Sequence, residues 1–130
     1  CGCIFSNYIG YGCLVFSTSY PESTIGTACA AGWIRIHHYV QQFQSIGTSC
    51  SDPTLGAVAQ YYSDTNAVNL RGLPFVAKSG MLDDNVHPWN LRRFVRILGN
   101  VNLEAQDGGL MSSNSTERLI EIYEVADKGH

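Results

Sequence analysis

Two adjacent carboxylates and a carboxamide, Asp83, Asp84 and Asn85, are the residues of this chain whose types and spacing could do chemistry. Carboxylates and carboxamides can hydrogen-bond a ligand or a neighbouring side chain. The three residues come after a short apolar run, residues 75–77, and after Gly80. Adjacent aspartates in a loop before a helix are also common turn and capping residues. Both interpretations place them in a loop between two regular elements.

The residues before this loop predict a strand of a parallel sheet. Residues 75–77 follow Pro74 and carry no charge, which is typical of a strand buried on both faces of a parallel sheet. Gly80 is expected to end the strand. Open α/β sheets bind their ligands just outside the carboxyl ends of the strands, so the loop is a candidate site.

An amphipathic helix is predicted directly after the loop. Pro88 suits its first turn, His87 or Asn85 could cap it, and Gly99 suits its end. The apolar residues recur at i, i+3, i+4 and i+7 and would face the sheet. They are Leu91, Phe94, Val95 and Leu98. The other face carries Arg92, Arg93 and Arg96.

The loop and the start of the helix resemble a known signature. Residues 80–93 read Gly-Met-Leu-Asp-Asp-Asn-Val-His-Pro-Trp-Asn-Leu-Arg-Arg. This segment is similar to the acid loop of the prolyl oligopeptidase family of serine peptidases, which are α/β-hydrolases. The resemblance implies that Asp83 orients a catalytic histidine and that Asn85 contacts a substrate carbonyl.

The first segment of the chain resembles the nucleophile elbow of the same family. Residues 1–5 predict a short buried strand and residues 10–19 a helix, as in the strand-turn-helix of an elbow. Residues 7–14, Asn-Tyr-Ile-Gly-Tyr-Gly-Cys-Leu, are similar to the family's Ser-Tyr-Gly-Gly-Tyr-Gly-Ala-Leu. On this alignment Asn7 occupies the position of the nucleophilic serine. The backbone NH of Tyr8 occupies the position of an oxyanion-hole donor.

The elbow departs from the family at its reactive positions. Asn7 offers no nucleophile, and Phe5 and Ile9 stand where the family has the two glycines of Gly-x-Ser-x-Gly. Ser6 is one residue away, but a shift of one residue along a strand turns a side chain to the opposite face. We therefore expect no hydrolase activity from this chain alone.

A second buried strand of small residues is predicted at residues 27–34, and an aromatic-rich segment follows at 37–69, with a short helix within residues 55–62. The resemblance implies that the aromatic-rich segment shapes a substrate pocket over the active-site mouth. The alternative is a helical connection packed on the sheet. His37 and His38 are a poor metal pair, because adjacent side chains point in different directions and no acidic or cysteine partner has ligand spacing. We predict no metal and no other cofactor.

The last part of the chain predicts a surface connection, a strand and a tail. Residues 99–115 are polar and rich in glycine, which indicates a surface connection. Residues 118–125 predict a strand, close to a sheet edge because it carries Glu121 and Glu124. The family's catalytic histidine lies in the loop after this strand, so the resemblance implies that role for His130. A lone histidine in a terminal tail is otherwise more often solvated.

The charge content is low for a soluble domain. Charged residues make up 15% of the chain, against roughly 25% in typical domains. This shortage suggests that part of the surface faces another polypeptide segment. The net charge is −3 and no basic stripe suggests nucleic acid. No run is apolar enough for a membrane span and no signal peptide is visible. Because the chain begins with Cys, we expect a processed product or a fragment.

The cysteines favour buried thiols over a disulfide network. They number five, at positions 1, 3, 13, 29 and 50, with no paired Cys-x-x-Cys spacing. Asn114 begins a glycosylation sequon, Asn-Ser-Thr, which favours a secretory route only slightly.

These observations predict an α/β fold in which residues 1–130 form the C-terminal half of an α/β-hydrolase domain, with about four mostly parallel strands and flanking helices. The resemblance implies a peptidase-type domain for peptides or small esters that lacks its nucleophile. The alternatives are a non-catalytic module that binds a peptide or another ligand, or an intact elbow motif hidden by a misassignment at residues 5–9. We expect another chain, or a missing N-terminal half, to cover the exposed edge of the elbow strand.

Overall fold

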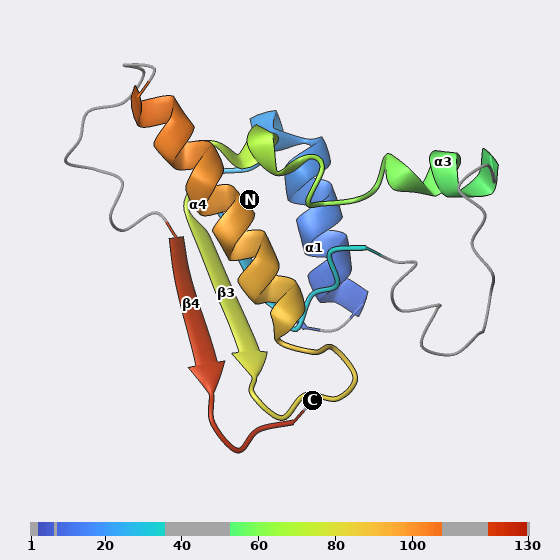
Figure 1. Ribbon diagram of the computed structural model, residues 1–130, viewed down its shortest axis with the longest axis vertical. Helices are drawn as coiled ribbons and strands as arrows, with labels where there is room; N and C mark the ends of the chain where they lie inside the picture. The colour runs from blue at the N-terminus through green and yellow to red at the C-terminus, as the bar shows by residue number, and fades with distance from the viewer. Residues whose placement is uncertain (1–2, 7, 36–52, 108–119, 130) are drawn as a thin grey trace.

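Four parallel strands form one sheet in the order β1-β2-β3-β4, which is also their order along the chain (Figure 1). They are β1 (Cys3–Ser6), β2 (Thr27–Ala30), β3 (Phe75–Gly80) and β4 (Ile120–Val125). The computed structural model describes residues 3–6, 8–35, 53–107 and 120–129. The prediction of an α/β fold with about four parallel strands is confirmed.

The register runs straight across the sheet. Cys3 pairs with Thr27, Thr27 with Phe75, and Phe75 with Ile120. Because all four strands are parallel and start level, their carboxyl ends meet at the same edge of the sheet. This edge is called the rim below. It is the place where open α/β sheets hold their ligands.

Two helices cover one face of the sheet, α1 (Tyr8–Ser19) and α4 (Trp89–Asp107) (Figure 1). A short 3-10 helix, η2 (Ala67–Leu70), contacts both of them. The remaining helices are η1 (Pro21–Ser23) and α3 (Pro53–Ala59). None of the helices in the described segments is long and apolar enough to span a membrane.

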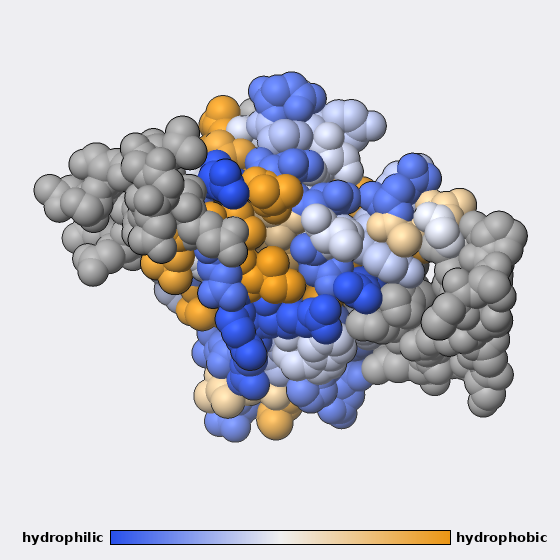
Figure 2. Space-filling model, turned by 45° about the horizontal axis from the view of Figure 1, so that its top comes forward, coloured by the Kyte–Doolittle hydropathy of each residue, from blue (hydrophilic) through white to orange (hydrophobic). Residues whose placement is uncertain are grey.

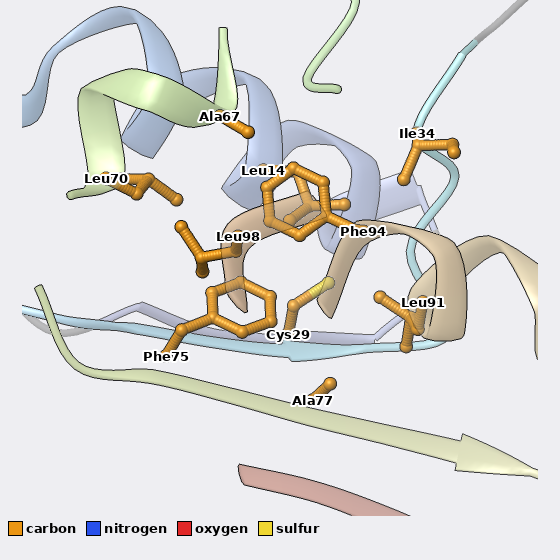
Figure 3. Packing of buried hydrophobic residues seen from close by; sticks show 10 residues of the cluster. All are labelled: Leu14, Cys29, Ile34, Ala67, Leu70, Phe75, Ala77, Leu91, Phe94 and Leu98. Atoms are coloured by element: carbon orange, nitrogen blue, oxygen red, sulfur yellow. The ribbon is translucent and has the colours of Figure 1, made fainter. Parts of the chain in front are cut away.

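The hydrophobic core lies between this sheet face and the two helices (Figure 3). The rings of Phe75 on β3 and Phe94 on α4 lie 5.2 Å apart between centroids. The cluster comprises Leu14, Cys29, Ile34, Ala67, Leu70, Phe75, Ala77, Leu91, Phe94 and Leu98. The predicted apolar stripe of the helix is therefore confirmed at three of its positions, while Val95 is only half-buried.

The prediction that β3 is buried on both faces is wrong. Phe75 and Ala77 are buried, whereas Val76 is half-buried and Lys78 is exposed. Within the described segments the core cluster gathers on the single face that α1 and α4 cover. The alternation of side chains along a strand then turns every second residue toward the uncovered face.

The predicted end of the second strand is also wrong. The strand expected at residues 27–34 ends at Ala30, and Ala31 has a positive φ of 47°. Gly80 was expected to end the strand before the acid loop, and this prediction is confirmed, because Gly80 is the last residue of β3 and pairs with Val125. The neighbouring strand thus extends β3 to the rim.

Helix α4 does not end at Gly99 but continues to Asp107, so the predicted surface connection is wrong for residues 99–107. Asn102 lies four residues after Leu98 and continues the buried stripe, with 1% of its surface exposed. Its Oδ1 accepts a hydrogen bond of 2.9 Å from the backbone NH of Gly72. This packing outweighs the cost of about 1 kcal/mol for a glycine inside a helix.

Other predicted elements agree with the structure. The helix expected at residues 10–19 corresponds to α1, and the short helix expected within residues 55–62 overlaps α3. The last strand, β4, lies at an edge of the described sheet, as predicted. Cys13 and Cys29 are buried thiols, which confirms that prediction for these two. Residues 108–115, and with them Asn114, lie outside the described segments.

Candidate active site

The connection from β1 to α1 is short. The strand ends at Ser6 and the helix begins at Tyr8, so a single residue joins them. That residue is Asn7, the predicted nucleophile position, which lies outside the described residues. The backbone of Tyr8, the predicted oxyanion donor, opens the helix at the rim.

The amino-terminal turn of α1 lies in close contact with the end of β2. A Cβ atom on Gly10 would lie 2.4 Å from the carbonyl oxygen of Ala30, and one on Gly32 would lie 2.4 Å from Sγ of Cys29. The Cys29 thiol donates a hydrogen bond of 3.3 Å to the carbonyl oxygen of Gly10. Burial raises the pKa of this thiol, so it stays protonated and acts as a donor. Only glycine leaves room for this approach.

Asp83 is the acid of the loop after β3, and 2% of its surface is exposed. Its Oδ1 accepts hydrogen bonds from the backbone NH groups of Asn85 at 3.0 Å and Val86 at 2.8 Å. The carboxylate therefore fixes the fold of its own loop, as the turn interpretation predicts. The same bonds also hold the carboxylate in one orientation. Asn85 and Asp84 are exposed beside it.

The start of α4 distinguishes between the two predicted caps. Nδ1 of His87 accepts a hydrogen bond of 3.3 Å from the backbone NH of Trp89, and the Asn90 side chain donates to the His87 carbonyl oxygen at 3.1 Å. His87 therefore caps the helix. Asn85 takes part in neither of these two hydrogen bonds, and it lies exposed at the rim.

The tail after β4 packs against the acid loop, near the chain end marked C in Figure 1. The backbone NH of Met81 donates to the Val125 carbonyl oxygen at 3.0 Å, and that of Leu82 donates to the Lys128 carbonyl oxygen at 3.0 Å. A Cβ atom on Gly129 would lie 3.5 Å from the carbonyl oxygen of Leu82. The next residue is His130, the predicted catalytic histidine, which lies outside the described residues.

Sequence reasoning missed a buried acid, Asp64, within the aromatic-rich segment. Asp64 has 3% of its side chain exposed and bonds Arg35, with Nε distances of 3.0 Å to Oδ1 and 2.8 Å to Oδ2. Nη2 of Arg93 on α4 bonds the same carboxylate at 3.1 Å. The Arg35 guanidinium also lies 5.1 Å from the ring centroid of Tyr62. Its bond to Asp64 raises the pKa of Arg35. Three chain segments are thus joined at one carboxylate.

Replacing Asp64 with asparagine is expected to lower the free energy of unfolding by about 1–2 kcal/mol, because two guanidinium groups lose a charged acceptor. The cost stays moderate because the arginine side chains are 27% and 44% exposed and remain hydrated. Urea unfolding followed by circular dichroism measures it. Asp84→Asn is the matched control, since Asp84 is exposed in the acid loop. Equal stability of the two variants would show that this cluster contributes nothing.

The described residues contain no group of three or more His, Cys, Asp or Glu that could hold a metal ion. The His37-His38 pair lies outside them, as does the first part of the aromatic-rich segment, residues 37–52.

Comparisons with known proteins give a fold but no family. No family model and no curated protein matches the chain. Solved structures do match, among them a candidate dipeptidyl aminopeptidase IV from Bacteroides ovatus ATCC 8483, with a TM-score of 0.68 and 12% sequence identity. That match covers 96% of this chain and 15% of the Bacteroides chain.

A second similar structure is TT1662 from Thermus thermophilus, with a TM-score of 0.54 and 13% identity over 90% of this chain and 43% of the other. Both structures are α/β-hydrolase-like. At these identities the likeness concerns the fold alone, and the chain spans less than half the length of either protein. The predicted fold class is confirmed: the chain has a partial α/β-hydrolase fold.

Proposed function

We propose that this chain is the C-terminal half of a prolyl oligopeptidase-type catalytic domain whose nucleophile is absent, so that the chain alone does not hydrolyse peptides or esters. The observation that carries the proposal is the packing of the tail before His130 on the loop of the buried Asp83. The order of elbow, acid and histidine along the chain supports it. Dipeptidyl peptidases belong to the family that the acid loop resembles, and one similar structure carries such a name.

The chemistry of an active relative would be acyl transfer. A serine attacks the carbonyl carbon, an imidazole takes the serine proton and later gives it to the leaving group, and a carboxylate fixes the imidazole tautomer. In our proposal His130 is the imidazole and Asp83 is the carboxylate, and the backbone NH of Tyr8 would stabilise the oxyanion. Asn7 supplies no group that can form the acyl intermediate. A site without its nucleophile retains only the small rate that binding and the oxyanion hole provide.

A binding role for the rim is the second candidate. Asn85 is exposed next to the buried Asp83, and its backbone is anchored to that carboxylate. An exposed carboxamide on a fixed backbone can bond a peptide carbonyl with little loss of entropy. Met81 and Leu82 expose 48% and 62% of their surface in the same loop and could contact apolar side chains. This candidate needs no reaction.

The proposal includes a covering partner for β1. Among the described strands β1 pairs only with β2, which leaves its other edge open. An open parallel edge invites pairing with another strand. A further polypeptide segment, in this protein or in another chain, is the covering element that we propose.

A fluorophosphonate probe tests the loss of activity. We expect no covalent adduct on the chain, detected by intact mass, under conditions that label a known serine hydrolase completely. Asn7→Ser is expected to remain unlabelled, because Phe5 and Ile9 still occupy the glycine positions of the elbow. An adduct on Ser6 or on any other residue of the unmodified chain would overturn the proposal.

A further inference from the structure

The outer face of α4 carries a groove that the proposed rim chemistry does not use. The groove has a volume of about 620 Å³. Its lining residues form two rows along the helix with a spacing of four residues, which places them side by side on one face. The first row is Arg92, Arg96 and Asn100, and the second is Trp89, Arg93 and Ile97. In the view of Figure 2 hydrophilic side chains form a band across the middle of the molecule, next to hydrophobic ones.

Two of the three arginines are held in place by carboxylates of other elements. Arg92 forms an ion pair with Glu124 of β4, including a bond of 3.0 Å from Nη2 to Oε2. Arg93 bonds the buried Asp64 at 3.1 Å. Arg96 has no ion pair within the described segments. Three guanidinium groups face two carboxylates, so the groove is cationic in a chain whose net charge is −3.

Anchored arginines are well suited to bind a second anion. A guanidinium group has five N–H donors in a rigid fork, and one carboxylate occupies only some of them. The anchoring also reduces the side-chain entropy that binding would otherwise cost. Arg92, which is anchored by Glu124, and Arg96, which is not anchored, lie in the same row of α4.

The spacing of this row fits an extended peptide. Arg92 and Arg96 are four residues apart, which is about 6 Å along a helix that rises 1.5 Å per residue. Alternate residues of an extended chain lie about 6.6 Å apart and point to the same side. From Trp89 to Asn100 the groove runs about 16 Å by the same helical rise, the length of about five extended residues.

We propose that this groove binds an extended acidic peptide segment with carboxylates at alternate positions. One carboxylate meets Arg92 and the next meets Arg96, while apolar side chains of the peptide contact Trp89, which is 38% exposed, and Ile97. A single small anion would use one guanidinium fork and leave the apolar ends of the groove without contacts. The site lies along the helix rather than at the rim, so it does not depend on the proposed function.

Two labelled peptides of the same composition test the spacing. Fluorescein-labelled Gly-Glu-Val-Glu-Val-Gly has alternate glutamates, and Gly-Val-Glu-Glu-Val-Gly has adjacent ones. Fluorescence anisotropy of the full chain is expected to give an affinity at least about fivefold higher for the alternate peptide, because only its carboxylates match the arginine row. Equal affinities, or no binding of either peptide, would overturn the proposal.

Matched variants test the residues. Arg96→Gln is expected to weaken binding of the alternate peptide by about fivefold to tenfold, since one charge-assisted contact is lost, and Arg96→Lys by less. Lys78→Gln removes the same charge from the exposed face of β3, away from α4, and is expected to leave the affinity unchanged. Equal losses for Arg96→Gln and Lys78→Gln would mean general charge attraction and contradict the site. Displacement of the peptide by inorganic phosphate at equal ionic strength would indicate a simple anion site and also contradict it.

Discussion

Replacing Phe94 with alanine is expected to lower the free energy of unfolding by about 3–5 kcal/mol. Its side chain is fully buried, and its ring packs against Phe75 at 5.2 Å in the middle of the core. The substitution removes the ring contact between α4 and β3 and leaves a cavity in the core. A domain of this size has about 5–15 kcal/mol of stability in total, so the loss is a large part of it. Urea unfolding followed by circular dichroism measures it.

Two further variants keep this prediction testable. Phe94→Leu retains most of the apolar volume and is expected to lose less than the alanine variant, which matters if that variant does not fold. Leu103→Ala is the control on the same helix, because Leu103 is 58% exposed, and it is expected to change stability by less than about 1 kcal/mol. If Phe94→Ala and Leu103→Ala lost the same amount, the core could not lie where α4 meets β3.

Periodicity predicted the helix and its buried face well because the signal is local. Leu91, Phe94 and Leu98 are all buried where their spacing places them. The end of the helix could not be predicted in this way, since Gly99 is a common stop signal and the sequence does not show what α4 contacts further on. The bond between Asn102 and Gly72 joins residues 30 positions apart. Contacts of this kind decide where a helix ends but leave no pattern in the sequence.

The strand β3 shows the same limit for sheets. Its uncharged start predicted a buried strand, and Phe75 and Ala77 are buried. Which faces are covered depends on where helices cross, and both α1 and α4 lie on one side (Figure 1). Residues 75–77, on which the prediction rested, are apolar on both faces and cannot report that choice, whereas the charge of Lys78 lies on the uncovered face.

The candidate site was predictable where one short segment carries it. Asp83 and Asn85 were selected because they lie in one unbroken signature, and the structure places them in a loop at the rim. Asp64 was missed because its partners Arg35 and Arg93 each lie 29 residues away, one on either side. No spacing rule connects such residues. The roles of all the predicted site residues remain predictions; they are Asn7, Tyr8, Asp83, Asn85 and His130.

The contact between the acid loop and the tail depends on the absence of a side chain at Gly80. A Cβ atom there would lie 2.3 Å from the Lys128 carbonyl oxygen and 2.6 Å from that of Gly129. Both obstacles are backbone atoms, which cannot rotate away as a flexible side chain could. Either β3 or the tail must move to make room, and the tail has fewer contacts to lose.

Replacing Gly80 with alanine is therefore expected to lower the free energy of unfolding by about 2–3 kcal/mol, at the upper end of the range for overpacked sites. The bond from the Leu82 NH to the Lys128 carbonyl oxygen should break with the displacement of the tail. Hydrogen exchange of the Leu82 amide is measured by NMR in the variant and in the unmodified chain. Relative to exchange of the amides in α4 under the same conditions, it is expected to become at least about tenfold faster in the variant.

The matched control has the opposite sign. A Cβ atom on Gly99 meets nothing within 4 Å, and the residue lies inside α4. Gly99→Ala is expected to raise stability by about 0.5–1 kcal/mol through helix propensity, with no effect on exchange of the Leu82 amide. Changes of the same sign in both variants would contradict the steric argument. Unchanged protection of the Leu82 amide in Gly80→Ala would mean that the tail does not rest on the acid loop, and His130 would then lose its structural support as the partner of Asp83.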